Sequence, residues 1–310
     1  MRLKLKTRRK GFTLIELSFA IAFISVLLIT VTLITNEIVS IYRKGYAIKL
    51  VNQVGRELIT DIQGSISQSP PTSISSFCKS AYDDDDQQQE CLKNDGFYSV
   101  YQQYYAEASI KNGDGTKKYV PIGGIFCSGK DTYIWNSGYL FNGENDYTFS
   151  DNVNSLKLSV KYSIDNAEKT ATNFRLLKIE DNSREICAST LKGEGLTYPS
   201  VQLPLVAPGS NTENNREIVV PYPLVEEPKD IIRESDATLA IFDFVAFEPA
   251  HVTNSNRLLY SGSFILGTTT GSVDIMATSD YCKTPSNYSS ADFSYCAINK
   301  FNFTVQSTGE

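Results

Sequence analysis

A long run of hydrophobic residues near the start of the chain predicts a membrane-spanning helix. From Phe12 to Thr35 the only charged residue is Glu16. Because a helix rises ~1.5 Å per residue, a run of this length crosses the ~30 Å hydrocarbon core of a bilayer. A basic leader precedes the run, so the positive-inside rule keeps the leader in the cytoplasm and the rest of the chain outside. Its basic residues are Arg2, Lys4, Lys6, Arg8, Arg9 and Lys10.

Beyond Thr35 the apolar positions thin out, and their spacing predicts that the same helix continues over residues 36–69. Intervals of three, four and seven residues are typical of one face of an amphipathic helix. Gly45 and Gly55 each weaken this helix by up to ~1 kcal/mol. The prolines in Ser69-Pro70-Pro71 end it, because proline has no amide hydrogen. The expected face comprises Ile38, Ile41, Tyr42, Ile48, Val51, Leu58, Ile59, Ile62 and Ile66.

From Phe97 onward the pattern becomes that of β-strands, with aromatic and β-branched runs between Gly, Asn and Asp turns. The alternation in Leu156–Tyr162 predicts a strand with one buried face, and we expect it to pair with Asn173–Ile179. The apolar run Thr238–Phe247 predicts a central strand buried on both faces. Residues 191–229 are rich in Pro, Gly and Asn, which indicates an irregular excursion or a boundary between sub-domains. The other expected strands are Phe97–Tyr101, Ala108–Lys111, Thr116–Val120, Asp131–Trp135, Tyr139–Phe141, Leu258–Leu266, Ser272–Met276 and Ile298–Val305.

These patterns predict an α+β fold, in which one long N-terminal α-helix packs on an antiparallel β-sheet head. The chain divides into a leader (1–11), a membrane-spanning helix (12–35), its amphipathic continuation (36–69) and an extracellular β-rich head (70–310).

The start of the hydrophobic run has two details that an ordinary membrane anchor lacks. A secretory signal peptide has its small-residue cleavage site after the apolar core, whereas Gly11 lies before it. A carboxylate in a membrane helix is costly, which makes Glu16 a functional candidate. Cleavage after Gly11 would give Phe12 a new α-amino group, and an ion pair with Glu16 would neutralise both charges.

The segment Gly11-Phe12-Thr13-Leu14-Ile15-Glu16-Leu17 after a short basic leader resembles the type IV prepilin signal. Pilins share this signal with the pseudopilins of type II secretion and competence systems. The resemblance implies cleavage between Gly11 and Phe12 by a membrane prepilin peptidase, and N-methylation of Phe12. It also implies that Glu16 docks the N-terminus of an incoming subunit during assembly. Many pilins have a proline or glycine within the hydrophobic half of the helix, and this chain has none from Phe12 to Arg43.

A helix followed by antiparallel strands and a disulfide-closed loop near the C-terminus is also the layout of pilin heads, so the resemblance implies a pilin-like fold. Common pilins are smaller than this chain of 310 residues, which favours a minor subunit. The implied partners are other pilins through the N-terminal helix, prepilin peptidase, an inner-membrane assembly platform, and membrane lipid before assembly. Without the leader, 23 of the 29 Lys and Arg residues remain against 35 Asp and Glu, a net charge of −12 that disfavours nucleic acid as a partner.

All six cysteines follow the hydrophobic run, on the side of the membrane where disulfides persist. Six cysteines allow fifteen pairings. We expect the short loops Cys78–Cys91 and Cys282–Cys296 to close, which leaves Cys127–Cys187 by elimination. A metal site is the alternative, but the chain has no CxxC motif and a single histidine.

Few residues carry candidate chemistry. The adjacent aspartates Asp83–Asp86 predict a solvated loop, with a calcium site as the alternative, although EF-hand-like ligands alternate with other residues. His251 is the only histidine, and no GxSxG, HExxH or P-loop motif is present. Trp135 and the 18 tyrosines either belong to the sheet or line a ligand groove. We therefore expect no enzyme activity, no cofactor and no resident metal.

The function that the sequence favours is that of a minor type IV pilin. The chain would be held in the cytoplasmic membrane with its head outside, and then assembled into or at the tip of an extracellular filament. One alternative is a tip adhesin that binds a surface or host-cell ligand through the head. Another is a pseudopilin in a type II secretion or DNA-uptake apparatus.

Overall fold

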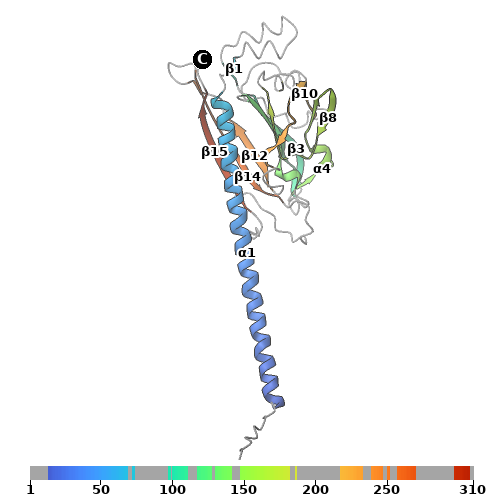
Figure 1. Ribbon diagram of the computed structural model, residues 1–310. Coiled ribbons are helices and arrows are strands. Elements are labelled where there is room, and N and C mark those ends of the chain that lie inside the picture. Colours follow the sequence, from blue (N-terminus) through green and yellow to red (C-terminus); the bar gives the residue numbers. More distant parts are fainter. Residues whose placement is uncertain are drawn as a thin grey trace, which may run out of the picture.

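The computed structural model shows one long helix and a β-rich head (Figure 1). α1 (Leu14–Ser67) is a continuous helix of 54 residues. At 1.5 Å per residue it is about 80 Å long, and its first half extends away from the head. The predicted helix is confirmed, and it ends just before Ser69-Pro70-Pro71. The structure describes residues 13–68, 72–73, 97–98, 100–110, 117–127, 130–141, 147–181, 186, 217–232, 239–246, 250–251, 257–269 and 297–307.

The apolar residues in the middle of α1 do not lie on the same side of the helix as those that pack on the head. Ile38 and Tyr42 are 60% and 72% exposed, whereas Val54 and Leu58 are buried against the head. At ~100° per residue, Ile38 lies roughly 160° around the helix from Val54, and Tyr42 lies equally far from Leu58. The expectation of a single apolar face is therefore wrong. The residues of α1 buried against the head are Ala47, Val51, Val54, Gly55, Leu58, Ile62, Ser65 and Ile66.

The middle of the head is a six-stranded antiparallel sheet. In spatial order its strands are β11 (Lys229–Asp230), β9 (Leu176–Glu180), β5 (Asp131–Asn136), β4 (Lys117–Cys127), β3 (Val100–Ile110) and β6 (Tyr147–Phe149). β3 pairs with β4 in antiparallel fashion, and the two strands overlap the expected strands Ala108–Lys111 and Thr116–Val120, although residues 111–116 lie outside the described residues. The strand expected at Tyr139–Phe141 is wrong. The Ser137 side chain accepts a hydrogen bond from the Tyr139 amide and starts a 3-10 turn, η1 (Gly138–Leu140).

A three-stranded sheet covers one side of this layer. In spatial order its strands are β10 (Glu217–Leu224), β7 (Ser159–Ile164) and β8 (Ala167–Ala171). Asp165 and Asn166 have φ angles of 50° and 62°, so a two-residue turn leads β7 directly into β8. The expected pairing of Leu156–Tyr162 with Asn173–Ile179 is therefore wrong, and β9 pairs with β5 instead. β10 is parallel to β7, so residues 217–224 are part of a sheet and not of an irregular excursion.

A third sheet lies between α1 and the rest of the head. Its strands are β12 (Leu239–Ala246) and β13 (Ala250–His251) along one edge of β14 (Leu258–Thr268), and β15 (Ile298–Gln306) along the other edge. β12 is largely buried, as predicted, but it lies at an edge of its sheet and not at the centre. Short elements complete the described part of the fold, namely α4 (Val153–Leu156), β1 (Thr72–Ser73) and β2 (Phe97–Tyr98).

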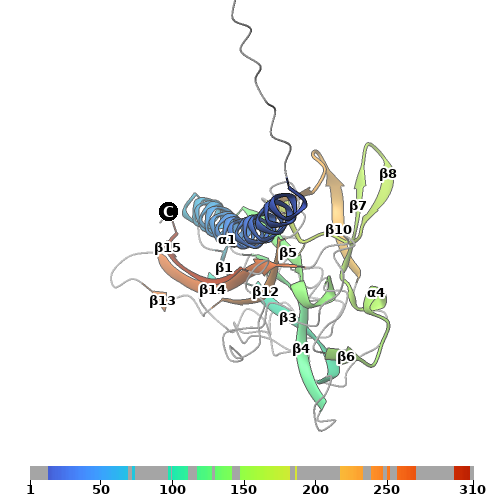
Figure 2. The ribbon, with the colours of Figure 1, turned by 90° about the horizontal axis from the view of Figure 1, so that it is seen from below.

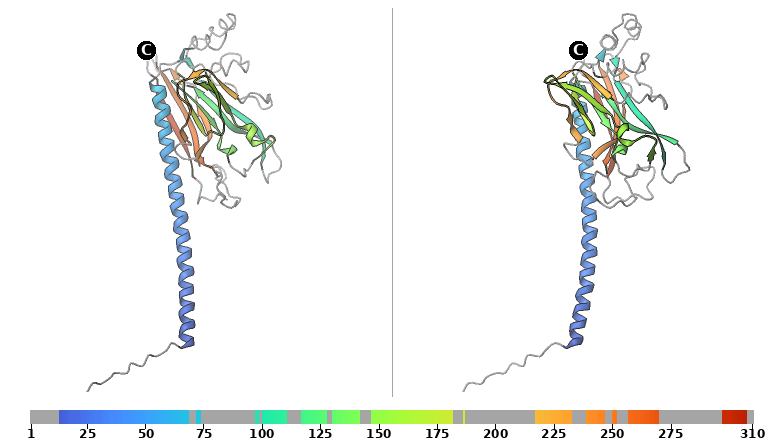
Figure 3. Two further views of the ribbon diagram at one scale, coloured as in Figure 1. Left: turned by 45° about the vertical axis from the view of Figure 1, so that its right-hand side comes forward. Right: turned by 90° about the vertical axis from the view of Figure 1, so that its right-hand side faces the viewer.

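β15 lies beside α1 and runs in the same direction (Figures 1 and 3). The Asn299 side chain donates to Asn52 Oδ1 at 2.8 Å, and the Gln63 side chain donates to the Thr304 carbonyl oxygen at 2.9 Å. The eleven residue steps from Asn52 to Gln63 along the helix span about 16 Å, and the five steps from Asn299 to Thr304 along the strand span nearly the same length. Helix and strand therefore stay in register along this contact.

Alternate residues of β5 contribute to two separate hydrophobic cores. Tyr133 and Trp135 belong to the core under α1, together with residues of β12, β14 and β15. Ile134 belongs to the core between the six-stranded and three-stranded sheets. Figure 2 shows α1 over β14 and β15, with β7, β8 and β10 on the right-hand side of the head. The second half of α1 is thus part of the core, and the α+β class is confirmed.

Candidate functional site: the N-terminal helix and its contact with the head

The first turn of α1 holds the single charge of the hydrophobic run. Glu16 Oε2 accepts hydrogen bonds from the amide and the hydroxyl of Thr13, both at 2.9 Å, and Thr13 Oγ1 accepts from the Glu16 amide at 3.3 Å. This reciprocal capping box satisfies groups that have no partner within a helix. Gly11 and Phe12 lie outside the described residues, so their cleavage and methylation stay predictions. Glu16 follows the predicted new N-terminal residue, Phe12, by four positions in the sequence.

The first half of α1 is a candidate membrane span by its length and composition, and none of its most apolar stretch is buried by the head. Its hydroxyl groups are satisfied within the helix, where they donate to carbonyl oxygens three or four residues earlier at 2.8–3.2 Å. Backbone and hydroxyl groups that are paired internally suit a surface that faces hydrocarbon or other helices. These hydroxyl residues are Ser18, Ser25, Thr30, Thr32 and Thr35.

Gly55 allows an aromatic ring to lie directly on the backbone of α1. A Cβ atom at this position would be 2.2–2.5 Å from three ring atoms of Phe301. The rings of Phe264, Phe244 and Trp135 continue inward from Phe301, with successive centroid distances of 5.3, 6.1 and 4.8 Å. Trp135 is 1% exposed, so it belongs to the sheet core and does not line a groove. The glycine that weakens the helix locally is therefore required by its contact with β15.

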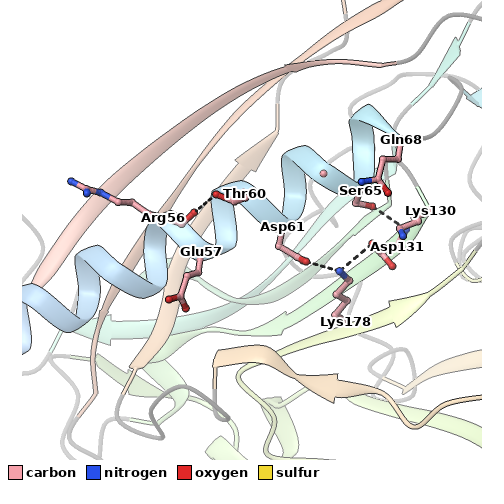
Figure 4. A pocket seen from close by; sticks show the side chains of 10 residues that line it. Arg56, Glu57, Thr60, Asp61, Ser65, Gln68, Lys130, Asp131 and Lys178 are labelled. Atoms are coloured by element: carbon pink, nitrogen blue, oxygen red, sulfur yellow. Dashed lines mark hydrogen bonds and ion pairs between the residues drawn. The ribbon is translucent and has the colours of Figure 1, made fainter.

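Near its C-terminal end, α1 makes a polar contact with β5 and β9 (Figure 4). Lys178 Nζ lies 2.6 Å from Asp61 Oδ1 on the helix and 3.3 Å from Asp131 Oδ2 on β5. The Tyr133 hydroxyl donates to Asp61 Oδ2 at 3.0 Å, and the Asp131 amide donates to Ser65 Oγ at 3.2 Å. We call these five residues the polar clasp. The polar clasp connects helix and sheet beside the aromatic core.

The partly buried location of the polar clasp changes its proton equilibria. Burial, together with the charges of Asp61 and Asp131, raises the pKa of Tyr133 far above its usual value. Burial disfavours the charge on Lys178, but the hydrogen bond to Asp61 and the charge of Asp131 raise its pKa overall. Both groups therefore stay protonated around neutral pH. A groove of about 540 Å³ runs beside the clasp and is lined by Arg56, Glu57, Thr60, Asp61, Gly64, Ser65, Gln68, Lys130, Asp131 and Lys178.

Cys127, at the end of β4, is disulfide-bonded, and it is the only cysteine among the residues that the structure describes. Thr132 Oγ1 lies 3.3 Å from Cys127 Sγ and donates to Asp181 Oδ2 at 3.1 Å. The Ile186 amide donates to the same carboxylate oxygen at 3.2 Å. The partner cysteines lie outside the described residues, so the pairings stay predictions: Cys127–Cys187, Cys78–Cys91 and Cys282–Cys296.

Other sequence candidates are not brought together by the described part of the fold. In that part no group of three or more His, Cys, Asp or Glu side chains is placed to hold a metal ion. His251 belongs to the short strand β13, and Asp83–Asp86 lie outside the described ranges. The expectations of no enzyme activity, no cofactor and no nucleic-acid partner stay predictions.

No protein-family model, no curated protein and no solved structure matches this chain. The family assignment therefore depends on the residues around Gly11 and Glu16.

Sequence reasoning missed both contacts that fix the helix on the head. Gly55 was recognised only as a local weakness, since its partner Phe301 comes about 250 residues later in the chain. The polar clasp combines Asp61 with residues of β5 and β9, and no local pattern connects these positions. Asp61 is one of several charged residues in this part of α1, together with Arg56 and Glu57, so its position in the sequence did not distinguish it.

Proposed function

We propose that this chain is a minor subunit of the type IV filament superfamily, made as a prepilin and assembled through its N-terminal helix. The observation that carries the proposal is an apolar half-helix that the head leaves exposed and that begins with a single carboxylate, Glu16. Within it Leu14, Phe19 and Phe23 are 85%, 71% and 70% exposed. A surface of this kind is stable in lipid or among like helices, and not in water.

The energetic basis of assembly is a change of surroundings for this half-helix. In the cytoplasmic membrane, lipid covers it while the head lies outside. In a filament, packing against like helices replaces the lipid contacts. The resemblance implies that prepilin peptidase cleaves the leader and that an inner-membrane assembly platform moves the chain from the membrane into the filament.

Glu16 fixes how far the N-terminal helices of neighbouring subunits are shifted along one another. An unpaired carboxylate in apolar surroundings is costly, so every arrangement is penalised except the one in which an α-amino group meets it. Thr13 holds the carboxylate at the helix end in the single chain, at 2.9 Å from both its donors. The incoming N-terminus of a neighbouring subunit would then replace or join these hydrogen bonds.

The proposal is tested by processing and by incorporation into filaments. Intact mass and N-terminal sequencing of the protein from its native membrane should give a chain that begins at N-methyl-Phe12. Glu16→Ala should be processed in the same way but be missing from sheared filaments, because cleavage does not need the carboxylate and docking does. The matched control is Glu37→Ala, which removes the next acidic residue of the same helix and should be incorporated normally. Normal incorporation of Glu16→Ala, or a chain that still begins at Met1, would contradict the proposal.

A further inference from the structure

Two cations of the head lie on the ring of Phe141. The guanidinium carbon of Arg175 is 3.5 Å from the centroid of this ring, and Lys157 Nζ is 4.8 Å from it. An aromatic face attracts a cation, but two like charges on one ring repel each other, so the fold has to hold them there. Figures 1 and 2 show α4, which ends just before Lys157, at the side of the head away from α1.

A buried asparagine holds the two cation-bearing segments together. Asn136 is 0% exposed, and its side chain donates to the carbonyl oxygens of Leu158 and Phe174, both at 3.2 Å. Its Oδ1 accepts from the Leu158 amide at 2.7 Å. The first of these partners directly follows Lys157 in the chain, and the second directly precedes Arg175. One buried side chain therefore fixes the two cations relative to each other.

Within the described part of the chain, Lys157 donates its hydrogen bonds to amide oxygens and not to carboxylates. Its ammonium donates to Asn173 Oδ1 at 2.7 Å and to Asn154 Oδ1 at 3.4 Å. Burial and the charge of Arg175 lower the pKa of Lys157, because both disfavour its positive charge. A negatively charged ligand beside the two cations would offset both effects. Sites that break a rule of good packing or pairing in this way are often functional.

We propose that Phe141, Asn154, Lys157, Asn173 and Arg175 form a binding site for the carboxylate of an acidic sugar. We call these five residues the cationic cluster. Lys157 is half-buried and can contact a ligand directly, while Arg175, only 8% exposed, adds a positive charge that water screens poorly. The two asparagines are exposed, and their amide hydrogens suit the hydroxyl groups of a sugar.

The charge of the whole chain makes this site local. Without its leader the chain has 23 basic and 35 acidic residues, so general attraction does not bring a polyanion to it. Recognition of an acidic polysaccharide would therefore depend on the cationic cluster itself. This inference goes beyond the proposed function, because it assigns a ligand to the head and does not involve the N-terminal helix.

Calorimetric titration of the purified full chain in detergent tests the proposal. The probes are tri-galacturonate and its methyl ester, which keeps the sugar hydroxyls and removes the charges. The acid should bind, and the ester should bind at least about tenfold more weakly. Free galacturonate should displace the trimer at a lower concentration than inorganic phosphate does, because only the sugar also binds the amides. No binding of the acid, equal binding of acid and ester, or stronger displacement by phosphate would overturn the proposal.

Matched variants locate the binding in the cationic cluster. Lys157→Gln should weaken the binding of tri-galacturonate by about tenfold or more, because it removes a charged donor. Lys161→Gln removes the same charge from nearby β7, where Lys161 Nζ lies 2.8 Å from Glu168 Oε1, and should bind like wild type. Equal affinity in Lys157→Gln and wild type, or an equal loss in both variants, would contradict the site.

A third variant tests the amide without disturbing the backbone. Asn173 has a φ angle of 57°, a left-handed conformation that glycine also adopts. Asn173→Gly should therefore keep the fold and weaken the binding of tri-galacturonate, and unchanged affinity would contradict the role of this amide. Fluorescence of the single tryptophan, Trp135, should show a native head in each variant.

The outcome also distinguishes this inference from the proposed function, because the titration needs neither processing nor a filament. A chain that begins at Met1 and is absent from filaments, but binds tri-galacturonate through Lys157, would overturn the filament role and retain the sugar site. A processed chain that enters filaments but does not bind the acid would overturn the sugar site alone.

Discussion

Replacing Gly55 with alanine is the most direct test of how α1 is held on the head. The new Cβ atom would lie 2.2–2.5 Å from three ring atoms of Phe301. Carbon atoms in van der Waals contact are about 3.5–4.0 Å apart, so the ring or the helix has to move by more than about 1 Å. Phe301 is only 7% exposed and stacks on Phe264 at 5.3 Å, so the ring has no open space to enter.

Two opposing effects set the size of the change. Overpacking a closed core costs about 1–3 kcal/mol, while alanine in place of glycine stabilises a helix by up to about 1 kcal/mol. At Gly55 both apply, so we expect the free energy of unfolding to fall by up to about 2 kcal/mol. At Gly45 only the helix effect applies, because a Cβ atom there meets nothing within 4 Å.

The assay is urea denaturation of the full chain in detergent, followed through the fluorescence of Trp135. This residue is the only tryptophan, is 1% exposed, and lies 4.8 Å from Phe244 in the core under α1. Gly55→Ala should have a lower midpoint than wild type, and Gly45→Ala an equal or higher one. Phe301→Leu should restore part of the loss in the Gly55→Ala background, since a smaller side chain removes the conflict. Equal midpoints for the two alanine variants would refute the reasoning.

The polar clasp predicts that the stability of the head falls at alkaline pH. The predicted disulfides determine how many free thiols the chain should have. The pKa of Tyr133 is raised in the folded head, so stability present below about pH 10 should fall as the pH rises above that value. Tyr133→Phe should show a shallower fall in urea midpoint between pH 8 and 11, and equal slopes would contradict the role of this hydroxyl. Labelling of the unreduced, denatured chain should find no free thiol, and peptide mapping should join Cys127 to Cys187. Two or more labelled cysteines, or a different partner for Cys127, would exclude the predicted set of disulfides.

The helix was predictable from the sequence because its signals are local. The hydrophobic run, the spacing of apolar residues and the prolines after Ser69 together give α1 nearly to the residue. The buried face of the helix was not predictable, since intervals of three and four residues fit both the residues that pack on the head and the exposed Ile38 and Tyr42. Only the position of the head distinguishes Tyr42 from Leu58.

The sequence predicted the positions of the strands better than it predicted which strands pair with each other. β5, β7, β12, β14 and β15 all overlap runs that alternate or are apolar in the sequence. Pairing depends on contacts across the chain, so the parallel partner of β7 at Glu217–Leu224 was missed. The two-residue turn at Asp165-Asn166 joins β7 to β8, so the expected pairing of Leu156–Tyr162 with Asn173–Ile179 put β9 in the wrong sheet. Of the candidate site, Glu16 was predictable from its charge alone, whereas the polar clasp needed the fold.

The side-by-side course of α1 and β15 has a mechanical consequence. In the proposed filament, tension would pull each subunit along the axis of its N-terminal helix. Since the second half of α1 packs along one side of the head (Figure 1), that load would reach the head as shear along the helix–strand contact, where Asn52, Gln63 and the Phe301 ring at Gly55 resist sliding together. Contacts loaded in parallel share the force, whereas contacts that are peeled open fail one after another. A head attached in this way would stay folded on its helix under forces that detach a head held at one end.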